Sequence, residues 1–452
     1  MKTFELTRGP VGKTLFFYSL PLIAMNLVQI LFSSADITIL GIMVDDTAVA
    51  AVGACASLIS LFVSFFSTFV TGASILVATR AGAKDEAGAQ RATGVSFVAG
   101  LLFGLPLMAV ALIGAKHFLV WINCPLEILD SAVLYSRIYF AGMPMLMIST
   151  IAGNTLRAVG DSTKPMVHMM IAGILKIGLN VLFIGVFDLT VEGVALATLL
   201  SNTVALILGV SALFKNRSYC RLEYKNFRLR KTELRTIIQI GLPASLGGLA
   251  FYIGDLIISS QVNALDQLAI AARSISGQWD GIVQNVGMSI AYACMAMVGQ
   301  AVGAKDSRRV SQILRKGSLY VTIVDLSIGI ILMAFARPLL DLMTDSPEVI
   351  ALAIPKMALL CLTYFITSIM EVHYFSLNAM QRSKATAVVC FVCGFGIRSA
   401  WSFWISPLYP SLVTVHLPIP ISALIATVIY IIYYTSTKKY IIPSDTKSSL
   451  LK

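Results

Sequence analysis

The sequence has few charged residues, and this scarcity excludes an ordinary soluble fold. Asp, Glu, Lys and Arg make up 13% of the 452 residues, whereas soluble domains contain about 25%. Hydrophobic residues make up 57%, and the mean hydropathy is +0.83. We therefore expect lipid to be the solvent for most of the chain.

Motifs for metal binding, redox chemistry and nucleotide binding are also missing. The four histidines have no ligand-like spacing, and the seven cysteines form no disulfide framework. Gly12-Lys13-Thr14 resembles the end of a phosphate-binding loop, but Thr7 stands where that loop requires glycine. No HExxH motif or nucleophile elbow occurs on any predicted helix. We expect no metal, no cofactor and no enzymatic activity, and a membrane-embedded enzyme is a further alternative.

Apolar stretches long enough to cross a membrane, about 20 residues, occur twelve times. They cover residues 14–42, 48–79, 93–115, 131–156, 166–187, 192–214, 237–262, 268–302, 317–336, 351–380, 385–406 and 417–436. The sequence therefore predicts an all-α integral membrane protein with twelve transmembrane helices.

The sequence also contains an internal repeat that spans its two halves. Gly-Ala-Lys-Asp occurs at residues 82–85 and again at 303–306, an offset of 221 residues. Leu20-Pro21 is repeated as Leu242-Pro243. We predict two pseudo-symmetric six-helix lobes, 1–214 and 237–452, joined by a basic linker at 215–236. Parallel repeats in transporters commonly bind their ligands at the interface between the halves.

The positions of the basic residues explain the net charge of +11. Of the 34 Lys and Arg residues, 27 lie in alternate connections, in the linker and near the two ends of the chain. By the positive-inside rule, both termini and the linker are cytoplasmic, and the protein is a multi-pass protein of the cytoplasmic membrane. The basic linker has no nucleic-acid recognition motif, so we expect it to contact anionic lipid headgroups.

Polar residues in the first predicted helix fall on one face. Asn26, Gln29, Ser33 and Asp36 have helical spacing. A carboxylate in mid-membrane costs about 2.5 to 3.5 kcal/mol, so Asp36 should face a cavity or a partner. A structural contact between helices is the alternative. Pro21 in the same helix predicts a bend, because proline removes a backbone hydrogen bond.

The fifth predicted helix carries a possible partner for Asp36. Lys176 and Asn180 are four residues apart and share a face, and Asn154 and Thr198 are candidates to complete a polar pocket. If Asp36 and Lys176 pair, each stabilises the charge of the other. The pair is then either a fixed tie or an exchange site that opens when substrate or a proton arrives, and the sequence leaves both roles open.

The second half contains further ionisable residues inside predicted helices. The candidates for a cavity in this half are Asp255, Arg273, Asp280, Glu371, Tyr374 and Arg398. Structural pairing is the competing explanation, with Arg398 against Glu371 or Arg273 against Asp255 or Asp280. Lys356 lies toward the outer end of its helix, from where a lysine can extend to the headgroups.

The segment Leu156-Arg-Ala-Val-Gly-Asp-Ser-Thr-Lys-Pro165 resembles the loop after the fourth helix of the multidrug and toxic compound extrusion (MATE) family. Pro21 and Asp36 match the family's first helix, and Gly193-Val-Ala-Leu-Ala-Thr198 matches its sixth. The resemblance covers the whole chain. It implies a V-shaped pair of six-helix lobes that exports small organic cations in exchange for protons or sodium, acting as a monomer.

One departure from the family pattern affects the choice of coupling ion. Many prokaryotic members have an Asn and an Asp, four residues apart, where this chain has Lys176 and Asn180. An ammonium near Asp36 repels sodium, so we expect proton coupling, through Asp36 and Lys176 or through Asp255, Asp280 and Glu371. A flippase for a lipid-linked saccharide is the alternative function, although such proteins often carry more cavity arginines and additional helices.

Overall fold

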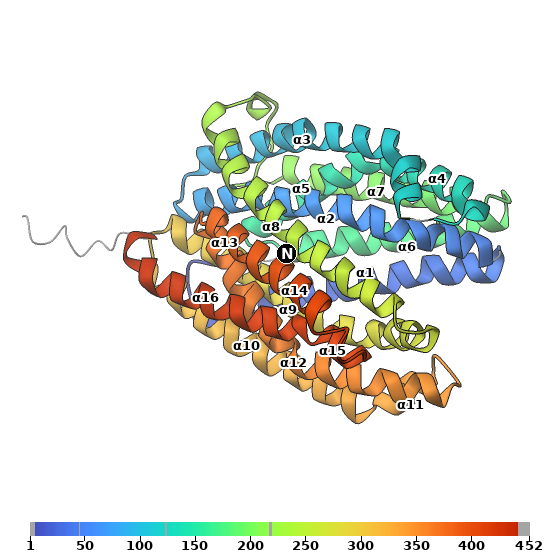
Figure 1. Ribbon diagram of the computed structural model, residues 1–452. Helices are drawn as coiled ribbons and strands as arrows, with labels where there is room; N and C mark the ends of the chain where they lie inside the picture. The colour runs from blue at the N-terminus through green and yellow to red at the C-terminus, as the bar shows by residue number, and fades with distance from the viewer. Residues whose placement is uncertain (1–4, 45, 123, 217–218, 442–452) are drawn as a thin grey trace, which may run out of the picture. The chain divides into compact units, whose positions relative to one another are not determined.

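The computed structural model describes residues 5–44, 46–122, 124–216 and 219–441. All regular structure in these ranges is helical (Figure 1). The first half contains α1 (Val11–Met43), α2 (Asp46–Gly82), α3 (Glu86–Trp121), α4 (Leu126–Ala141), α5 (Met143–Ala158), α6 (Thr163–Gly185) and α7 (Val191–Phe214). The connection and second half contain η1 (Tyr224–Asn226), α8 (Lys231–Asn263), α9 (Gln267–Gly303), α10 (Ser307–Ala334), α11 (Ala336–Asp341), α12 (Pro347–Ala379), α13 (Ser383–Val389), η2 (Cys390–Ile397), α14 (Arg398–Trp404), α15 (Leu412–His416) and α16 (Pro418–Ile441).

The helices confirm the predicted number of membrane spans. Among the described residues, eleven helices are long and apolar enough to cross a membrane, and the bent pair α4 and α5 makes the twelfth. The expectation of one continuous fourth helix over 131–156 is wrong, because α4 and α5 meet at an angle of 45°. Pro144 at the start of α5 has no N–H to donate to the carbonyl of Phe140, so the helix breaks around Gly142.

The repeated tetrapeptide forms the same turn in both halves. Lys84 and Lys305 both have left-handed backbone conformations, with φ of 59° and 57°. The next residue in each copy is a helix cap: Asp85 accepts a hydrogen bond of 2.8 Å from the N–H of Gly88, and Asp306 accepts one of 2.8 Å from Arg309. The sequence repeat is therefore also a repeat of local structure.

Contacts between Cα atoms divide the chain into two compact units. Unit 1 comprises residues 1–5 and 24–245, and unit 2 comprises 6–23 and 246–452. Helix α1 therefore contributes its first part to unit 2, and α8 contributes its first part to unit 1. Both divisions fall two residues after the repeated proline, after Ile23 for Pro21 and after Ser245 for Pro243. The predicted lobes, 1–214 and 237–452, rest on the sequence repeat and not on contacts between Cα atoms, and they stay a prediction.

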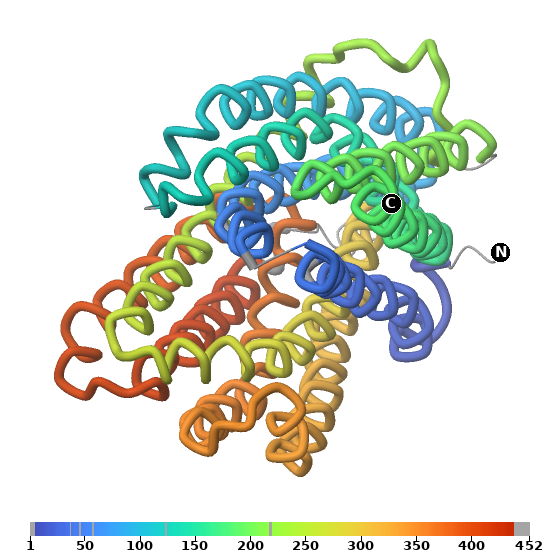
Figure 2. The backbone as a smooth tube through the Cα atoms, turned by 90° about the vertical axis from the view of Figure 1, so that its right-hand side faces the viewer, coloured from blue at the N-terminus to red at the C-terminus, as the bar shows by residue number. Residues whose placement is uncertain are grey.

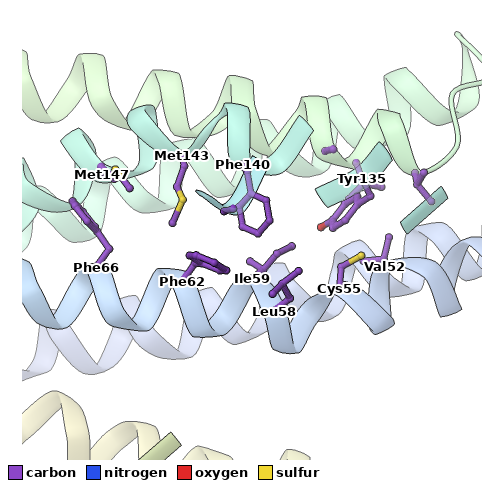
Figure 3. Close-up of a cluster of buried hydrophobic side chains, with 14 of the residues drawn as sticks. Val52, Cys55, Leu58, Ile59, Phe62, Phe66, Tyr135, Phe140, Met143 and Met147 are labelled. Carbon is purple, nitrogen blue, oxygen red and sulfur yellow. The ribbon is translucent and has the colours of Figure 1, made fainter. Parts of the chain in front are cut away.

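The core of unit 1 lies between α2 and the α4–α5 pair (Figure 3). Phe62 on α2 faces Phe140 on α4, and the two ring centroids lie 5.4 Å apart in an edge-to-face arrangement. Met143 and Met147 continue this core along α5. The bend at Gly142 thus keeps both helices packed against α2.

The connection between α7 and α8 is part of unit 1, runs outside the helices (Figure 2) and packs against α3. The carbonyl oxygen of Asn226 lies 2.3 Å from the point that a Cβ of Gly94 would occupy, so only glycine permits this approach to α3. Phe227 adds a ring contact with Phe97, with centroids 6.0 Å apart. The basic linker is therefore anchored at η1.

In unit 2, the most enclosed helix is α9, and α10 and α12 pack against it (Figure 1). In the most apolar 18-residue window of α9, 78% of the residues are buried. Polar side chains on this helix therefore mostly face protein. This enclosure is the setting for the ionisable groups described below.

Both described ends of the chain lie against the first turns of α10. Arg309 is 8% exposed and donates hydrogen bonds to the carbonyl oxygens of Leu6, Arg8 and Gly9 at 2.9, 2.9 and 3.1 Å. Near the other end, the hydroxyls of Ser311 and Tyr434 lie 2.8 Å apart. Residues 6–9 and Tyr434 thus lie at the same end of unit 2.

Candidate functional site

The first candidate site lies between α1 and α6 of unit 1. The ring of Phe32 on α1 lies within 2 Å of the point where a Cβ of Gly173 would stand, so glycine at this position lets the two helices approach. One turn further along each helix, Asp36 faces Lys176. The close contact at Gly173 therefore positions the charged pair.

Each oxygen of the Asp36 carboxylate has its own donor. Lys176 Nζ contacts Oδ2, and Asn180 Nδ2 donates to Oδ1 at 2.7 Å. The side chains of Asp36 and Lys176 are 13% and 18% exposed. The structure thus brings together three of the predicted residues, and a further cation at Asp36 would have to displace a donor.

The other two residues predicted for this pocket have different partners. Asn154 accepts a hydrogen bond from Arg157, and the Thr198 hydroxyl donates to the carbonyl of Val194 at 2.9 Å. Neither contacts Asp36 within the described ranges. Two tyrosines that the sequence analysis missed, Tyr135 and Tyr139 on α4, are in electrostatic reach of the Asp36 carboxylate. Their spacing of four residues was the available signal.

In unit 2, Arg398 is held by partners from two other helices. Its guanidinium contacts Asp255 on α8, donates to Ser422 Oγ on α16 at 3.2 Å, and lies 5.0 Å from the ring centroid of Phe251. Arg398 is 4% exposed, whereas the Asp255 side chain is 55% exposed. The alternative explanation, a structural pair of Arg398 with Glu371, is therefore wrong, because the Arg398 guanidinium pairs with Asp255 instead.

A second buried pair joins α9 and α12. Lys356 Nζ contacts Asp280 Oδ2, and the two side chains are 3% and 6% exposed. Lys356 thus lies inside the protein and does not extend to the membrane surface. Arg273 donates to Ser259 Oγ at 2.5 Å, and no carboxylate of the described residues lies within ion-pair distance of it. The alternative explanation, an ion pair of Arg273 with Asp255 or Asp280, does not occur among the described residues, because Arg398 and Lys356 contact these carboxylates; both carboxylates still interact electrostatically with Arg273.

Glu371 and Tyr374 lie apart from these pairs, further toward the C-terminal end of α12 than Lys356. Tyr374 is buried against Phe375 and Tyr430, with ring centroids 5.0 and 6.4 Å away. Glu371 is half-buried, and its Oε2 accepts no hydrogen bond from any described residue. Electrostatically, it interacts with Asp325 on α10, a fully buried carboxyl that the sequence analysis missed. Ser318 and Thr322 share a helix face with Asp325, a polar stripe that gave a usable signal.

Across the part of the chain that the structure describes, no three His, Cys, Asp or Glu side chains gather as metal ligands would. The ionisable side chains instead make ion pairs and one carboxyl pair inside apolar helices. This is the arrangement expected where polar residues line an ion or substrate pathway.

The sequence profile of one family, MatE, matches the chain twice, at residues 21–182 and 243–404. The chain belongs to the MatE family. The two matches start at Pro21 and Pro243 and are displaced by the same 222 residues as the repeated Leu-Pro. In this MatE protein, the internal repeat therefore corresponds to two copies of the family unit.

Bacterial relatives of known description resemble this MatE protein along most of its length. The probable multidrug resistance protein YoeA of Bacillus subtilis (strain 168) is 25% identical over 359 residues, which cover 78% of this chain and 77% of the relative. The multidrug export protein MepA of Staphylococcus aureus (strain NCTC 8325 / PS 47) is 25% identical over 305 residues, which cover 66% and 68%.

Solved structures show the same fold. A crystal structure of MATE in complex with MaL6 has a TM-score of 0.90 and 21% identity, covering 98% of this chain and 100% of the other. A transporter of the MOP superfamily from Pyrococcus furiosus, described as having a binding pocket of reverse polarity, has a TM-score of 0.89 and 21% identity, covering 98% and 100%. Both likenesses confirm the all-helical MATE fold.

Proposed function

We propose that this MatE protein exports small organic cations and drugs across the cytoplasmic membrane in exchange for protons. Family membership supports transport, and the printed names of the relatives support multidrug export. The observation that carries the choice of ion is the complete occupation of Asp36 by Lys176 and Asn180.

An exchange at Asp36 follows from that geometry. A proton that binds the carboxylate removes its negative charge, and the attraction to the Lys176 ammonium falls with it. A sodium ion would instead have to lie beside an ammonium, at a carboxylate whose two oxygens are already engaged. Protonation is the smaller rearrangement, so we assign coupling to protons at Asp36.

The position of the chain ends supports the proposed orientation. Residues 6–9 and Tyr434 contact the first turns of α10, so both segments lie at one end of unit 2. The same turns carry Arg308, Arg315 and Lys316. Basic residues mark the cytoplasmic side, and we assign this end, with both termini, to the cytoplasm.

The deciding experiment is ethidium efflux from proteoliposomes with a proton gradient or a sodium gradient imposed separately. We expect the proton gradient alone to drive efflux by the wild-type protein, and Asp36→Asn to lose it. Asp130→Asn is the matched control, because Asp130 is an exposed carboxylate near the start of α4. Efflux driven only by sodium would refute proton coupling, and efflux driven by neither gradient would refute antiport.

A further inference from the structure

Arg273 on α9 is a cation without an ion-pair partner inside a membrane-spanning helix. It lies six residues from Gln267, about 9 Å along the helix, and it is partly buried. Its guanidinium donates to Ser259 Oγ on α8 at 2.5 Å, and that hydroxyl donates to the backbone carbonyl of Asp255 at 2.8 Å. A guanidinium has five N–H donors. Ser259 engages only part of this capacity, so Arg273 has donors to offer to a ligand.

The carboxylates on the neighbouring helices already have basic partners. Lys356 contacts Asp280, and Arg398 contacts Asp255. Two negative charges therefore face three positive charges, and Arg273 carries the one that is left over. A charge without a counter-charge is costly in apolar surroundings, so an anion that binds at Arg273 would complete the balance.

The other two carboxyl groups inside the spans of unit 2 are too far away to supply that anion. Asp325 lies beside Gly287 of α9, which is fourteen residues from Arg273, about 21 Å along the helix. Glu371 is fifteen residues from Lys356, about 22 Å along α12. The missing negative charge therefore has to come from outside the described part of the chain.

The face of α9 that carries Arg273 also has room for a ligand. Gly277 and Gly281 follow Arg273 at intervals of four residues, so all three lie on one face. Among the described residues, a Cβ at Gly277 would meet only Lys356 Nζ, at 4.0 Å, and a Cβ at Gly281 would meet nothing within 4 Å. Glycines that serve helix packing have a neighbouring backbone in this space. These two instead leave an open groove along α9, with Arg273 at its end.

We propose that Arg273 binds the carboxylate of a transported molecule, whose apolar body lies in the groove at Gly277 and Gly281. A guanidinium binds a carboxylate through two parallel hydrogen bonds, which suits a group with several free donors. The inference rests on the proposed function and adds a substrate class to it: organic cations that also carry a carboxylate. A lipid phosphate is an oxyanion of similar chemistry, and the experiments below separate the two sources.

Dye binding to the purified protein in dodecyl maltoside, a detergent without phosphate, tests the proposal. One rhodamine dye is measured at neutral pH as its free acid and as its methyl ester, which lacks the carboxylate. By fluorescence anisotropy, we expect the wild-type protein to bind the free acid at least about tenfold more tightly, because only the acid makes charged hydrogen bonds to Arg273. Arg273→Gln should bind both forms equally, whereas Arg273→Lys should keep part of the preference. Equal binding by the wild type, or an unchanged preference in R273Q, would overturn the proposal.

An exposed arginine and a small anion provide the controls. Arg337 on α11 is exposed, so Arg337→Gln removes the same charge and should retain the preference. If R273Q does not fold, acetate tests the wild type, because acetate is too small to fill the groove. At equal ionic strength, acetate should weaken binding of the free acid more than chloride does and should leave the ester unaffected. Equal effects of acetate and chloride on the free acid would contradict the site.

Nanodiscs of phosphatidylglycerol separate a substrate carboxylate from a lipid phosphate. If Arg273 serves a substrate, the preference for the free acid should persist when this lipid surrounds the protein. A preference that is present in detergent and absent in the nanodiscs would mean that a lipid headgroup occupies Arg273, and the substrate assignment would be wrong.

The binding measurement is independent of the test of proton-driven export. It needs no gradient, so failure of proton-driven ethidium efflux would refute the proposed function and leave the preference for the free acid in place. Conversely, equal binding of acid and ester would remove the carboxylate site and leave export of simple organic cations standing.

Discussion

At Asp36, the donors Lys176 and Asn180 stand where many family members have an Asn and an Asp. The ammonium neutralises the carboxylate, and the amide adds a hydrogen bond without charge. The double variant K176N/N180D exchanges this arrangement for two carboxylates and one amide. Such a set of oxygen ligands attracts a monovalent cation that the native ammonium repels.

We therefore expect a sodium gradient to drive ethidium efflux by K176N/N180D, in contrast to the wild-type protein. Removing one favourable charge contact of about 1.5–3 kcal/mol corresponds to a change of tenfold or more. Ethidium efflux from proteoliposomes measures the switch, and Lys116→Asn, an exposed lysine on α3, is the control. If the double variant folds and a sodium gradient does not drive its efflux, Lys176 does not determine the coupling ion.

Gly287 makes a second residue-scale prediction. A Cβ at this position would stand 1.9 Å from Ser368 Oγ, so Gly287→Ala overpacks the junction of α9 and α12. Overpacking costs about 1–3 kcal/mol, and we expect the thermal unfolding midpoint of G287A to fall. Removing the hydroxyl relieves the closest contact but leaves Ser368 Cβ and Asp325 Oδ2 at 2.8 Å from the new methyl group, so G287A/S368A should unfold above G287A and below the wild-type protein. If the two variants unfold together, Ser368 is not the group that excludes a side chain.

At the scale of elements, the length of apolar runs was sufficient to predict where helices cross the membrane. The apolar length of residues 131–156 did not reveal the break between α4 and α5, although Gly142 and Pro144 were an available signal for it. The sequence placed the charged residues on the correct helices and named Lys176 as a possible partner of Asp36, but it did not find the partners of the ionisable residues in unit 2. Asp255 pairs with Arg398, and Asp280 with Lys356, across 143 and 76 residues of chain. Helical spacing defines the face of a residue, whereas its neighbour depends on tertiary packing.

The contact between α10 and the segment before α1 makes the prediction at this scale. Arg309 holds three backbone carbonyls of residues 6–9, and hydrogen bonds from a charged donor contribute about 1.5–3 kcal/mol each. We expect Arg309→Gln to release this segment and to raise the rate of tryptic cleavage after Arg8 more than tenfold. N-terminal sequencing of the digest measures the cleavage.

The neighbouring arginine provides the control for that experiment. Arg308 is exposed, and Arg308→Gln removes the same charge without touching residues 6–9. Equal cleavage of the two variants would mean that net charge, and not the three hydrogen bonds, protects the segment. Cleavage of neither would mean that packing of Leu6, which is 0% exposed, is sufficient to hold it.

At the scale of the whole molecule, the repeat was readable from the sequence because the same turn recurs at Lys84 and Lys305. The division of the chain into contact units was not readable. This division cuts α1 and α8 shortly after a proline, so that the two parts of each helix belong to different units. No local sequence pattern indicates which unit each part of a helix joins. The electrostatic interaction of Glu371 with Asp325 was likewise hidden, since the two residues lie on α12 and α10 and interact only through the packing of these helices.

The sidedness of the membrane assignment can be tested with cysteines that the chain already contains. Cys124, between α3 and α4, is partly exposed, whereas the other six cysteines are buried. Burial raises the pKa of the Cys220 thiol in the linker to about 12, so this thiol stays protonated and inert toward maleimides. Partial burial also raises the pKa of Cys124, so its labelling should accelerate as the pH rises.

We expect a membrane-impermeant maleimide to label Cys124 in intact cells. The linker should behave in the opposite way, as tested by introducing K225C into a C124S background, since the Lys225 side chain is 75% exposed. This thiol should react only after the membrane is permeabilised, because the positive-inside rule places the linker in the cytoplasm. C124S alone is the control for background labelling. Labelling of K225C in intact cells would reverse the assigned orientation, and with it the direction of the export proposed here.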